Sequence, residues 1–185
     1  MPELPEVETV RRDLLTSLLD KKITGVTVLN DKTISGPTEN FLKILSGSFF
    51  VDILRRGKLL ILKIKKKDSY LLVHLKMTGQ LIYLSGNSVV AGGHSLQAHS
   101  FEKSVGGELP NKHTRVIINF KDNSQLFFND LRKFGYMRVV NKEELEAFIA
   151  KNYGPEPLSA DFTLVGFSAQ LKRRRSIKAV LLDQK

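Results

Sequence analysis

The segment from Ile23 to Val140 consists largely of short apolar and β-branched runs separated by turn residues. The segments LLILKIKKKDSYLLVHL and INFKDNSQLFF are typical of hairpins that turn near Lys65–Ser69 and near Asp122 and Asn123. Because strands and helices do not alternate here, the pattern predicts a two-layer antiparallel β-sandwich, mainly β with flanking helices. We expect a short helix near residues 39–46 and strands near residues 23–30, 48–54, 59–65, 70–75, 79–84, 114–120, 125–129 and 136–140.

Helical patterns flank this β-rich region. The segment PELPEVETVRRDLLTSLLDKK carries apolar residues at helical spacing and predicts an N-terminal helix, and KEELEAFIAKNY predicts another. After GPEPL, the segment FSAQLKRRRSIKAVLLDQK predicts a basic amphipathic helix that starts a further domain. We therefore expect a β-sandwich domain over residues 1–150, with a linker and a first helix over 151–185. The stretch Ser85–Asn111 lacks a clear period and predicts a long loop.

The composition excludes several classes of protein. The 29 Lys and Arg against 19 Asp and Glu give a net charge of +10, which favours an anionic partner such as nucleic acid. The absence of cysteine excludes disulfides, thiolate metal sites and cysteine nucleophiles, and 4 scattered histidines leave little room for zinc. We therefore expect no metal or cofactor in this chain. With no long apolar run and no signal-peptide pattern, we expect no membrane segment.

The start of the chain holds the residues with the most specific chemistry. Met1 before proline is normally removed, which would expose the secondary amine of Pro2. An α-amino group has a pKa of roughly 7.7–8.0, so part of it is neutral and nucleophilic at physiological pH. Attack of this amine on an aldehyde-like carbon gives an iminium ion, and the neighbouring Glu3 is suited to proton transfer. The alternative is an ordinary helix start, in which proline and glutamate act as capping residues.

Basic residues form two candidate phosphate-binding groups. Arg55, Arg56 and Lys58 lie at a strand entrance, and a second group lies along the last predicted helix: Lys172, Arg173, Arg174, Arg175 and Lys178. Both groups are also compatible with solvated faces. His74, at the end of a strand, is suited to a phosphate contact or to a structural role.

Two apolar residues stand among turn and charge signals. Met77 precedes Thr78 and Gly79, and Phe134 lies in the segment NDLRKFG. Enzymes that turn a base out of the stack have to fill the vacated space, and Met and Phe side chains can do so. The guanidinium of Arg132 is suited to pair with the base left opposite. Taken singly, residues such as Met77 and Phe134 more often belong to the core.

Together these segments resemble the motifs of the bacterial formamidopyrimidine-DNA glycosylases, which repair oxidised purines. The resemblance covers nearly the whole chain and rests, in chain order, on MPELPEVETVRR, RRGKLLIL, HLKMTGQL, NDLRKFG, GPEPLSADF and RRRSIKAVLLDQK. It implies excision of 8-oxoguanine or formamidopyrimidines from duplex DNA, followed by β- and δ-elimination at the abasic site. The related endonuclease VIII branch typically starts PEGPE and prefers oxidised pyrimidines, so Leu4 favours the purine-specific branch.

The resemblance also implies a role for each matching residue. Pro2 is expected to attack C1′ and form the Schiff base, Glu3 to act as general acid and Glu6 to support the site. Lys58, which we group with these catalytic residues, is expected to hold phosphate together with His74 and Lys178. Three residues are expected to fill the gap and to probe the opposite cytosine: Met77, Arg132 and Phe134.

Two positions depart from the family's motifs. Lys76 stands where glycine is usual, which adds charge beside Met77 and is expected to alter the local geometry or the DNA contact. Leu131 stands where proline usually precedes the arginine, which is expected to loosen that turn. Neither departure touches Pro2 or Glu3.

Family members continue past the position of Lys185 into a helix–two-turn–helix domain and a four-cysteine zinc finger. The resemblance therefore implies that this chain is the N-terminal part of a bifunctional glycosylase and lyase, with weak or no excision by itself. The alternatives are a DNA-binding or structural fragment without turnover, and an endonuclease VIII-like enzyme; an RNA-binding module lacks an aromatic stacking platform. We expect a monomer, with dimerisation through exposed apolar residues as the alternative, and a location in the bacterial cytoplasm at the nucleoid.

Overall fold

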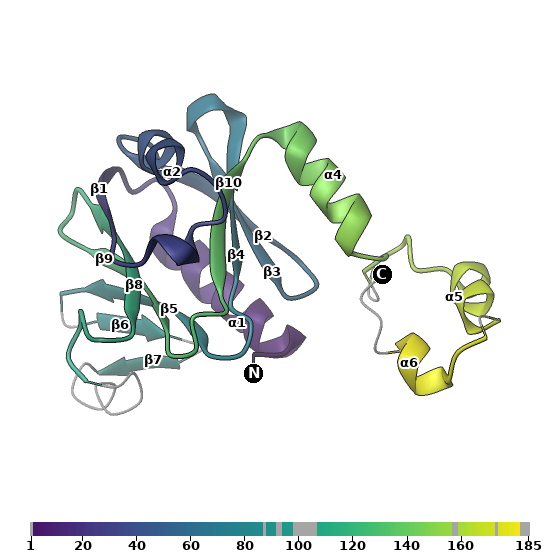
Figure 1. Cartoon of the computed structure of the whole chain (residues 1–185). Helices are drawn as coiled ribbons and strands as arrows, with labels where there is room; N and C mark the ends of the chain where they lie inside the picture. Colours follow the sequence, from purple (N-terminus) through teal and green to yellow (C-terminus); the bar gives the residue numbers. More distant parts are fainter. Residues whose placement is uncertain are drawn as a thin grey trace. The chain divides into compact units, whose positions relative to one another are not determined.

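The apolar runs between Ile23 and Val140 form two antiparallel sheets (Figure 1). A computed structural model describes residues 2–86, 88–91, 94–97, 107–156, 159–172 and 174–181. The chain divides into two compact units, Met1–Lys142 and Glu143–Lys185. The domain boundary expected between residues 150 and 151 stays a prediction.

Each sheet is built from neighbouring strands that pair in antiparallel fashion, which confirms the predicted β-sandwich. Within the described residues, the smaller sheet has the order β10 (Tyr136–Val140), β4 (Ser69–His74), β3 (Leu59–Ile64) and β2 (Phe50–Arg56). The larger sheet has the order β1 (Ile23–Val28), β8 (Thr114–Phe120), β9 (Gln125–Asp130), β5 (Gly79–Ser85), β6 (Ser88–Ala91) and β7 (His94–Gln97). Both predicted hairpins form, β3 with β4 and β8 with β9.

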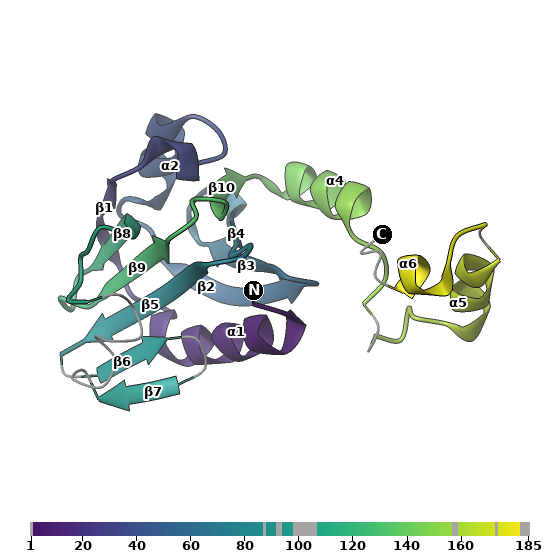
Figure 2. The same cartoon turned by 60° about the horizontal axis from the view of Figure 1, so that its bottom comes forward.

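Two helices pack against the sandwich and complete its core. Helix α1 (Leu4–Leu18) contacts β2, β3, β5 and β6, and helix α2 (Thr38–Leu45) contacts β1 and β10. Figure 2 shows α1 running beside β2. The buried face of α1 consists of the residues at helical spacing: Val7, Val10, Leu14 and Leu18. Each such side chain stabilises the fold by about 1.5–3 kcal/mol when fully buried, so the start of α1 is held firmly against the sheets.

The turn between β2 and β3 corrects one sequence prediction. The strand expected at 48–54 runs instead from Phe50 to Arg56. Gly57 has a φ of 53°, a left-handed conformation that glycine adopts without steric cost. The chain therefore reverses directly after Arg56. Lys58 lies in the hairpin turn at the entrance of β3, whereas Arg55 and Arg56 end β2.

The long loop predicted from Ser85 to Asn111 is wrong in part. Strands β6 and β7 lie within it and pair with each other, and β6 pairs with β5. Both strands are only four residues long, and the runs SVVA and HSLQ are too short to show the apolar alternation by which strands are recognised. Residues 87, 92–93 and 98–106 of the predicted loop lie outside the described residues.

The second unit corrects the prediction of one continuous basic helix. It contains α4 (Lys142–Asn152), which the sequence predicts, followed by α5 (Leu164–Leu171) and α6 (Ile177–Leu181). The hydroxyl of Ser176 accepts a hydrogen bond from the amide of Ala179 at 3.3 Å and so starts α6 as a separate helix. The lysine and arginine residues before Ser176 thus connect two helices, and only Lys178 of that group lies on α6.

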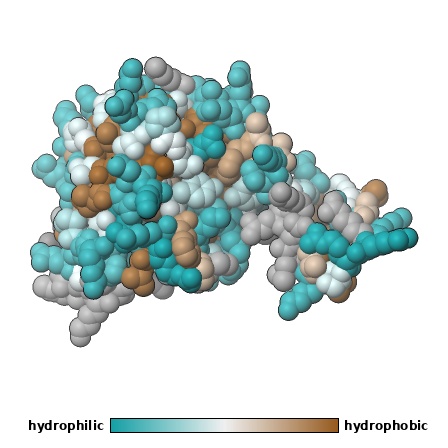
Figure 3. Space-filling model, in the orientation of Figure 1, coloured by the Kyte–Doolittle hydropathy of each residue, from teal (hydrophilic) through white to brown (hydrophobic). Residues whose placement is uncertain are grey.

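Figure 3 shows a largely hydrophilic surface with small groups of hydrophobic residues. In the first unit, the exposed apolar side chains include Met77, Leu131 and Phe134. All three lie in connections between strands rather than in the strands themselves. No helix in the described part of the chain is long and apolar enough to cross a membrane.

Candidate functional site

The start of α1 holds the predicted nucleophile and general acid. Glu3 is the residue that caps α1, and Pro2 directly precedes it. The Glu6 side chain accepts a hydrogen bond from the backbone amide of Glu3 at 3.0 Å. This bond fixes the backbone just after Pro2, in agreement with the supporting role expected for Glu6.

Lys58 reaches Glu3 from the turn between β2 and β3. Its Nζ atom lies 2.5 Å from Oε2 of Glu3. The Lys58 side chain is 19% exposed and the Glu3 side chain 52%, so the carboxylate is open to solvent while the amine is largely covered. The structure thus brings Lys58 to the neighbouring residues Pro2 and Glu3, from which it is distant in sequence.

A second ion-pair cluster fastens the same turn to α1. Glu8 of α1 accepts hydrogen bonds from Nε of Arg55 at 3.0 Å and from Arg11, and Arg55 in turn donates to the carbonyl of Gly57 at 2.8 Å. The hydrogen bonds from Arg11, with those from Arg55 and Arg12, lower the pKa of Glu8 to about 2. Because Lys58 follows Gly57, these contacts and the Lys58–Glu3 pair form a closed ring between α1 and the hairpin turn. The Arg55 guanidinium is thus part of this ring, and the phosphate contact considered in the sequence analysis stays a prediction.

His74 lies beside Lys58 at the end of β4. It pairs with Leu59 of β3 on one side and with Tyr136 of β10 on the other. Burial lowers the pKa of His74 to about 4, and the positive charges of Lys76 and Lys58 act in the same direction. The imidazole is therefore neutral at physiological pH. Its Nδ1 accepts a hydrogen bond from the Lys76 amide at 3.0 Å, which assigns the proton to Nε2 and leaves Nε2 as a hydrogen-bond donor.

Met77 lies in the connection between β4 and β5 and is 41% exposed. Gly79 closes this connection, because a Cβ atom there would lie 2.4 Å from the carbonyl oxygen of Leu75. Lys76 has a φ of 53°, a left-handed conformation, and its Nζ lies 5.8 Å from the centroid of the Tyr136 ring. The connection is thus tightly turned, and the Met77 side chain is presented to solvent.

Arg132 and Phe134 lie in the connection between β9 and β10. The guanidinium carbon of Arg132 is 4.8 Å from the centroid of the Phe134 ring, and Phe134 is 54% exposed. An exposed aromatic ring stacked with a cation is suited to contact with bases. The exposure of Met77 and Phe134 removes the alternative that either residue belongs to the core.

One buried carboxylate joins these two connections. Asp130 is 1% exposed, and its Oδ2 accepts a hydrogen bond from the Gly135 amide at 2.7 Å. Its Oδ1 accepts from the Thr78 hydroxyl and from the Arg132 amide, the latter at 3.2 Å. The Arg132 amide also donates to the Thr78 hydroxyl at 3.0 Å. Sequence reasoning missed both Asp130 and Thr78, although the position of a carboxylate directly before the turn residues of NDLRKFG is a signal for such a contact.

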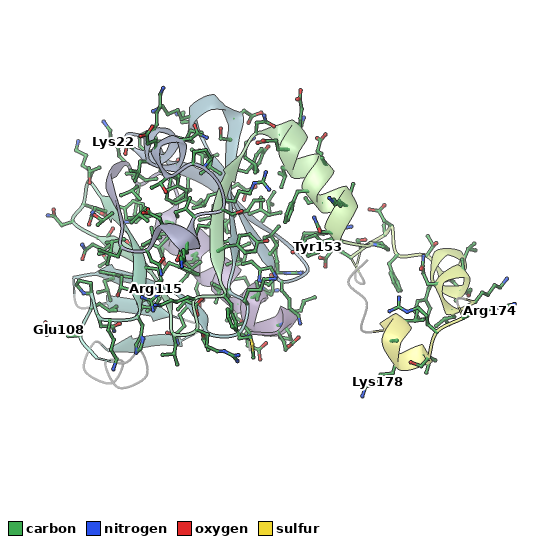
Figure 4. All side chains as sticks on the ribbon, in the orientation of Figure 1. Lys22, Glu108, Arg115, Tyr153, Arg174 and Lys178 are labelled. Atoms are coloured by element: carbon green, nitrogen blue, oxygen red, sulfur yellow. The ribbon has the colours of Figure 1, made fainter. Side chains whose placement is uncertain are left out.

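Lys178 lies on α6 in the second unit, where Figure 4 labels it together with Arg174. The other eight predicted site residues all belong to the first unit. Its contact with the same DNA as His74 therefore stays a prediction.

Comparison with known proteins places this geometry in a family. The family described as "Formamidopyrimidine-DNA glycosylase N-terminal domain" matches residues 1–137. Proteins named formamidopyrimidine-DNA glycosylase from Pelotomaculum thermopropionicum and Listeria monocytogenes are each 38% identical to this chain over its whole length. The chain spans 60% of the first protein and 61% of the second.

Solved structures of the Lactococcus lactis formamidopyrimidine-DNA glycosylase share the fold. The protein bound non-covalently to DNA with an abasic site matches with a TM-score of 0.81 and 30% identity, over 99% of this chain and 63% of that one. Its G226P variant, in complex with DNA that contains Fapy-dG, matches with a TM-score of 0.80 and 31% identity, over 99% of this chain and 60% of that one. The chain therefore belongs to the family of the formamidopyrimidine-DNA glycosylase N-terminal domain.

Proposed function

We propose that this chain carries the nucleophile and the void-filling residues of a DNA glycosylase and abasic-site lyase that acts on oxidised purines in duplex DNA. The observation that carries the proposal is the position of Pro2 next to the Glu3–Lys58 pair, whose Oε2 and Nζ atoms are 2.5 Å apart. Names of relatives that act on formamidopyrimidines support the substrate class. The complexes of the Lactococcus protein with abasic-site DNA support the DNA partner.

The reaction starts at the amine of Pro2. The free secondary amine attacks C1′ of the damaged nucleotide, the bond from C1′ to the base breaks, and the base leaves with the electron pair and a proton. Glu3 takes up the proton that the Pro2 amine loses and donates it to the sugar oxygen as the ring opens to the iminium ion, while the proton on the leaving base comes from water. The iminium acidifies C2′, so loss of a C2′ proton expels the 3′ phosphate, and loss of a C4′ proton then expels the 5′ phosphate. Lys58 holds the Glu3 carboxylate beside the reacting carbon.

Phosphate binding is proposed for the groups around this centre. His74 donates its Nε2 proton to a phosphate oxygen as a neutral hydrogen-bond donor, while Lys58 and Lys178 contribute positive charge. Met77, Arg132 and Phe134 occupy the space that the everted nucleotide leaves. The chemistry runs through an amine and a carboxylate, so it needs no cofactor from this chain. We further propose that the protein acts as a monomer at the nucleoid.

Borohydride trapping tests the proposal. With Met1 removal verified by mass spectrometry, the protein is incubated with duplex DNA that carries an abasic site opposite cytosine, and reduction converts the iminium into a stable adduct. We expect an adduct with the unaltered chain, and we expect Pro2→Gly to abolish adduct formation or to slow it greatly. Pro5→Gly is the matched control, because Pro5 lies in the first turn of the same helix but has no free amine.

The substrate class is tested with two further duplexes. An adduct on 8-oxoguanine opposite cytosine supports the oxidised-purine proposal, whereas an adduct on an oxidised pyrimidine alone supports an endonuclease VIII-like enzyme. DNA binding without any adduct, even on the abasic site, would reduce the chain to a DNA-binding fragment. An unchanged adduct with Pro2→Gly would remove Pro2 as the nucleophile.

A further inference from the structure

The three void-filling residues come from two separate connections in the chain. Met77 lies between β4 and β5, and Arg132 and Phe134 lie between β9 and β10. Two independently mobile loops would each lose conformational freedom on entering a stacked duplex. A contact that orders both loops before DNA binds would lower the free-energy cost of inserting their side chains into the duplex.

The Asp130 carboxylate makes contacts of this kind with both loops. Its Oδ1 accepts from the hydroxyl of Thr78, the residue directly after Met77. Its two oxygens also accept from the backbone amides on either side of Phe134, that of Arg132 at 3.2 Å and that of Gly135 at 2.7 Å. A single carboxylate that is 1% exposed therefore binds both loops.

The backbone of Asp130 is itself anchored to the larger sheet. Its carbonyl accepts a hydrogen bond from Nε of Arg115 in β8 at 3.0 Å, and its amide donates to the carbonyl of His113 at 2.9 Å. Figure 4 labels Arg115 inside the first unit. The carboxylate is therefore fixed in the sheet rather than carried along by either loop.

Close packing also connects the Phe134 loop with His74, the residue proposed to bind phosphate. A Cβ atom on Gly135 would lie 2.7 Å from Cζ of Phe128 and 3.1 Å from the carbonyl oxygen of His74. The end of the Phe134 loop thus rests against the end of β4. The void-filling loops and His74 share one rigid support.

We propose that Asp130 is a positioning residue that couples the Met77 and Phe134 loops, so that the void-filling side chains enter the duplex as one unit. The inference rests on the proposed function and deepens it. It requires Asp130 to matter where a nucleotide has to be turned out of a stacked duplex and not where the strand is already single.

The test compares Asp130→Asn on two substrates that carry the same abasic site, a duplex and a single strand. Asparagine keeps the shape but replaces one accepting oxygen with a donor. We expect adduct formation to slow by about 10- to 100-fold on the duplex, because a displaced group disrupts the reacting geometry. On the single strand we expect the rate to stay within about twofold. Equal losses on both substrates, or no loss on the duplex, would contradict the proposal.

Two further variants keep the test valid if Asp130→Asn folds poorly. Thr78→Val removes the hydroxyl that links the loops and should slow the duplex reaction selectively, whereas Thr78→Ser should restore it. Asp122→Asn is the matched control, because this carboxylate accepts from Ser124 in another turn after a strand and lies outside the candidate site. It should change neither rate.

A fluorescence measurement that requires no covalent reaction tests this proposal separately from the proposed reaction. 2-Aminopurine is placed opposite a tetrahydrofuran abasic analogue, where its fluorescence reports insertion of side chains into the stack. At saturating protein, the unaltered chain and Asp122→Asn should change the fluorescence, and Asp130→Asn should not. If the unaltered chain gives this signal without any borohydride adduct, the proposed reaction fails while the coupling stands. No signal from the unaltered chain overturns the coupling.

Discussion

Lys76 occupies a backbone conformation that glycine tolerates better. Its φ of 53° places Cβ close to the backbone, which costs on the order of 1 kcal/mol for most residues. We expect Lys76→Gly to raise the free energy of unfolding by about 0.5–1 kcal/mol, as measured by thermal and urea unfolding. Lys76→Ala removes the same charge but keeps Cβ, so it should not be stabilised. Equal stabilisation of both variants would assign the effect to charge instead of backbone strain.

His74 makes the stability of the protein depend on pH. Its pKa is lowered from 6.5 to about 4 in the folded protein, so folding favours the neutral imidazole. This contribution to stability is complete above pH 6.5 and is lost as the pH falls from 6.5 through 4. We expect the unaltered protein to lose about 2–3 kcal/mol over this range relative to His74→Asn, which does not titrate there. Parallel stability curves for the two proteins would show that His74 is not desolvated as described.

Helix α1 is positioned by charge as well as by apolar packing. Glu8 has a pKa lowered from 4.5 to about 2, so its ion pairs with Arg11 and Arg55 contribute fully above pH 4.5 and are lost as the pH falls to 2. We expect Glu8→Gln to lower the free energy of unfolding at neutral pH by about 1–2 kcal/mol. The difference should shrink as the pH falls below 4.5. Glu39→Gln, an exposed glutamate in the first turn of α2, is the control and should have no such effect.

Some of the strands and helices could be predicted from the sequence pattern and others could not. Strands β3, β4, β8 and β9 were predictable within a residue or so, because their apolar runs are long and their turns carry recognisable polar residues. Strands β6 and β7 were not predictable, because runs of four residues are too short to show an apolar alternation. The basic C-terminal segment keeps a helical pattern on both sides of Ser176, so its break depends on a capping bond that the pattern does not contain.

The candidate site follows the same division. Pro2, Glu3 and Phe134 were found from motifs in which each residue type has a chemical reason to be there. Glu8 was missed, because a carboxylate that anchors a helix looks in sequence like any surface carboxylate. Asp130 was missed although its position before a turn signals a local contact, because the sequence does not show its burial or its bond to Thr78. Their roles depend on burial and on partners that are brought together only by the fold.

The whole molecule carries a net charge of +10, spread over two compact units. If both units bind the same duplex, each phosphate contact adds about −0.9 to the slope of log affinity against log salt. We expect Lys178→Gln in the second unit and Lys58→Gln in the first to reduce the slope by about 1 each, as measured by fluorescence anisotropy. Lys32→Gln, on an exposed turn of the first unit, should leave it unchanged. An unchanged slope for Lys178→Gln would show that the first unit binds DNA alone.

The Asp130 contacts have an evolutionary consequence. On the β9–β10 side they are made to main-chain amides, of Arg132 and Gly135, so they do not depend on the identity of the side chains in that loop. Leu131, which is 60% exposed, stands where the family usually has proline and fits this arrangement. The backbone of this loop can therefore keep its course through substitutions between Leu131 and Phe134, as long as Thr78, Asp130 and Gly135 are retained.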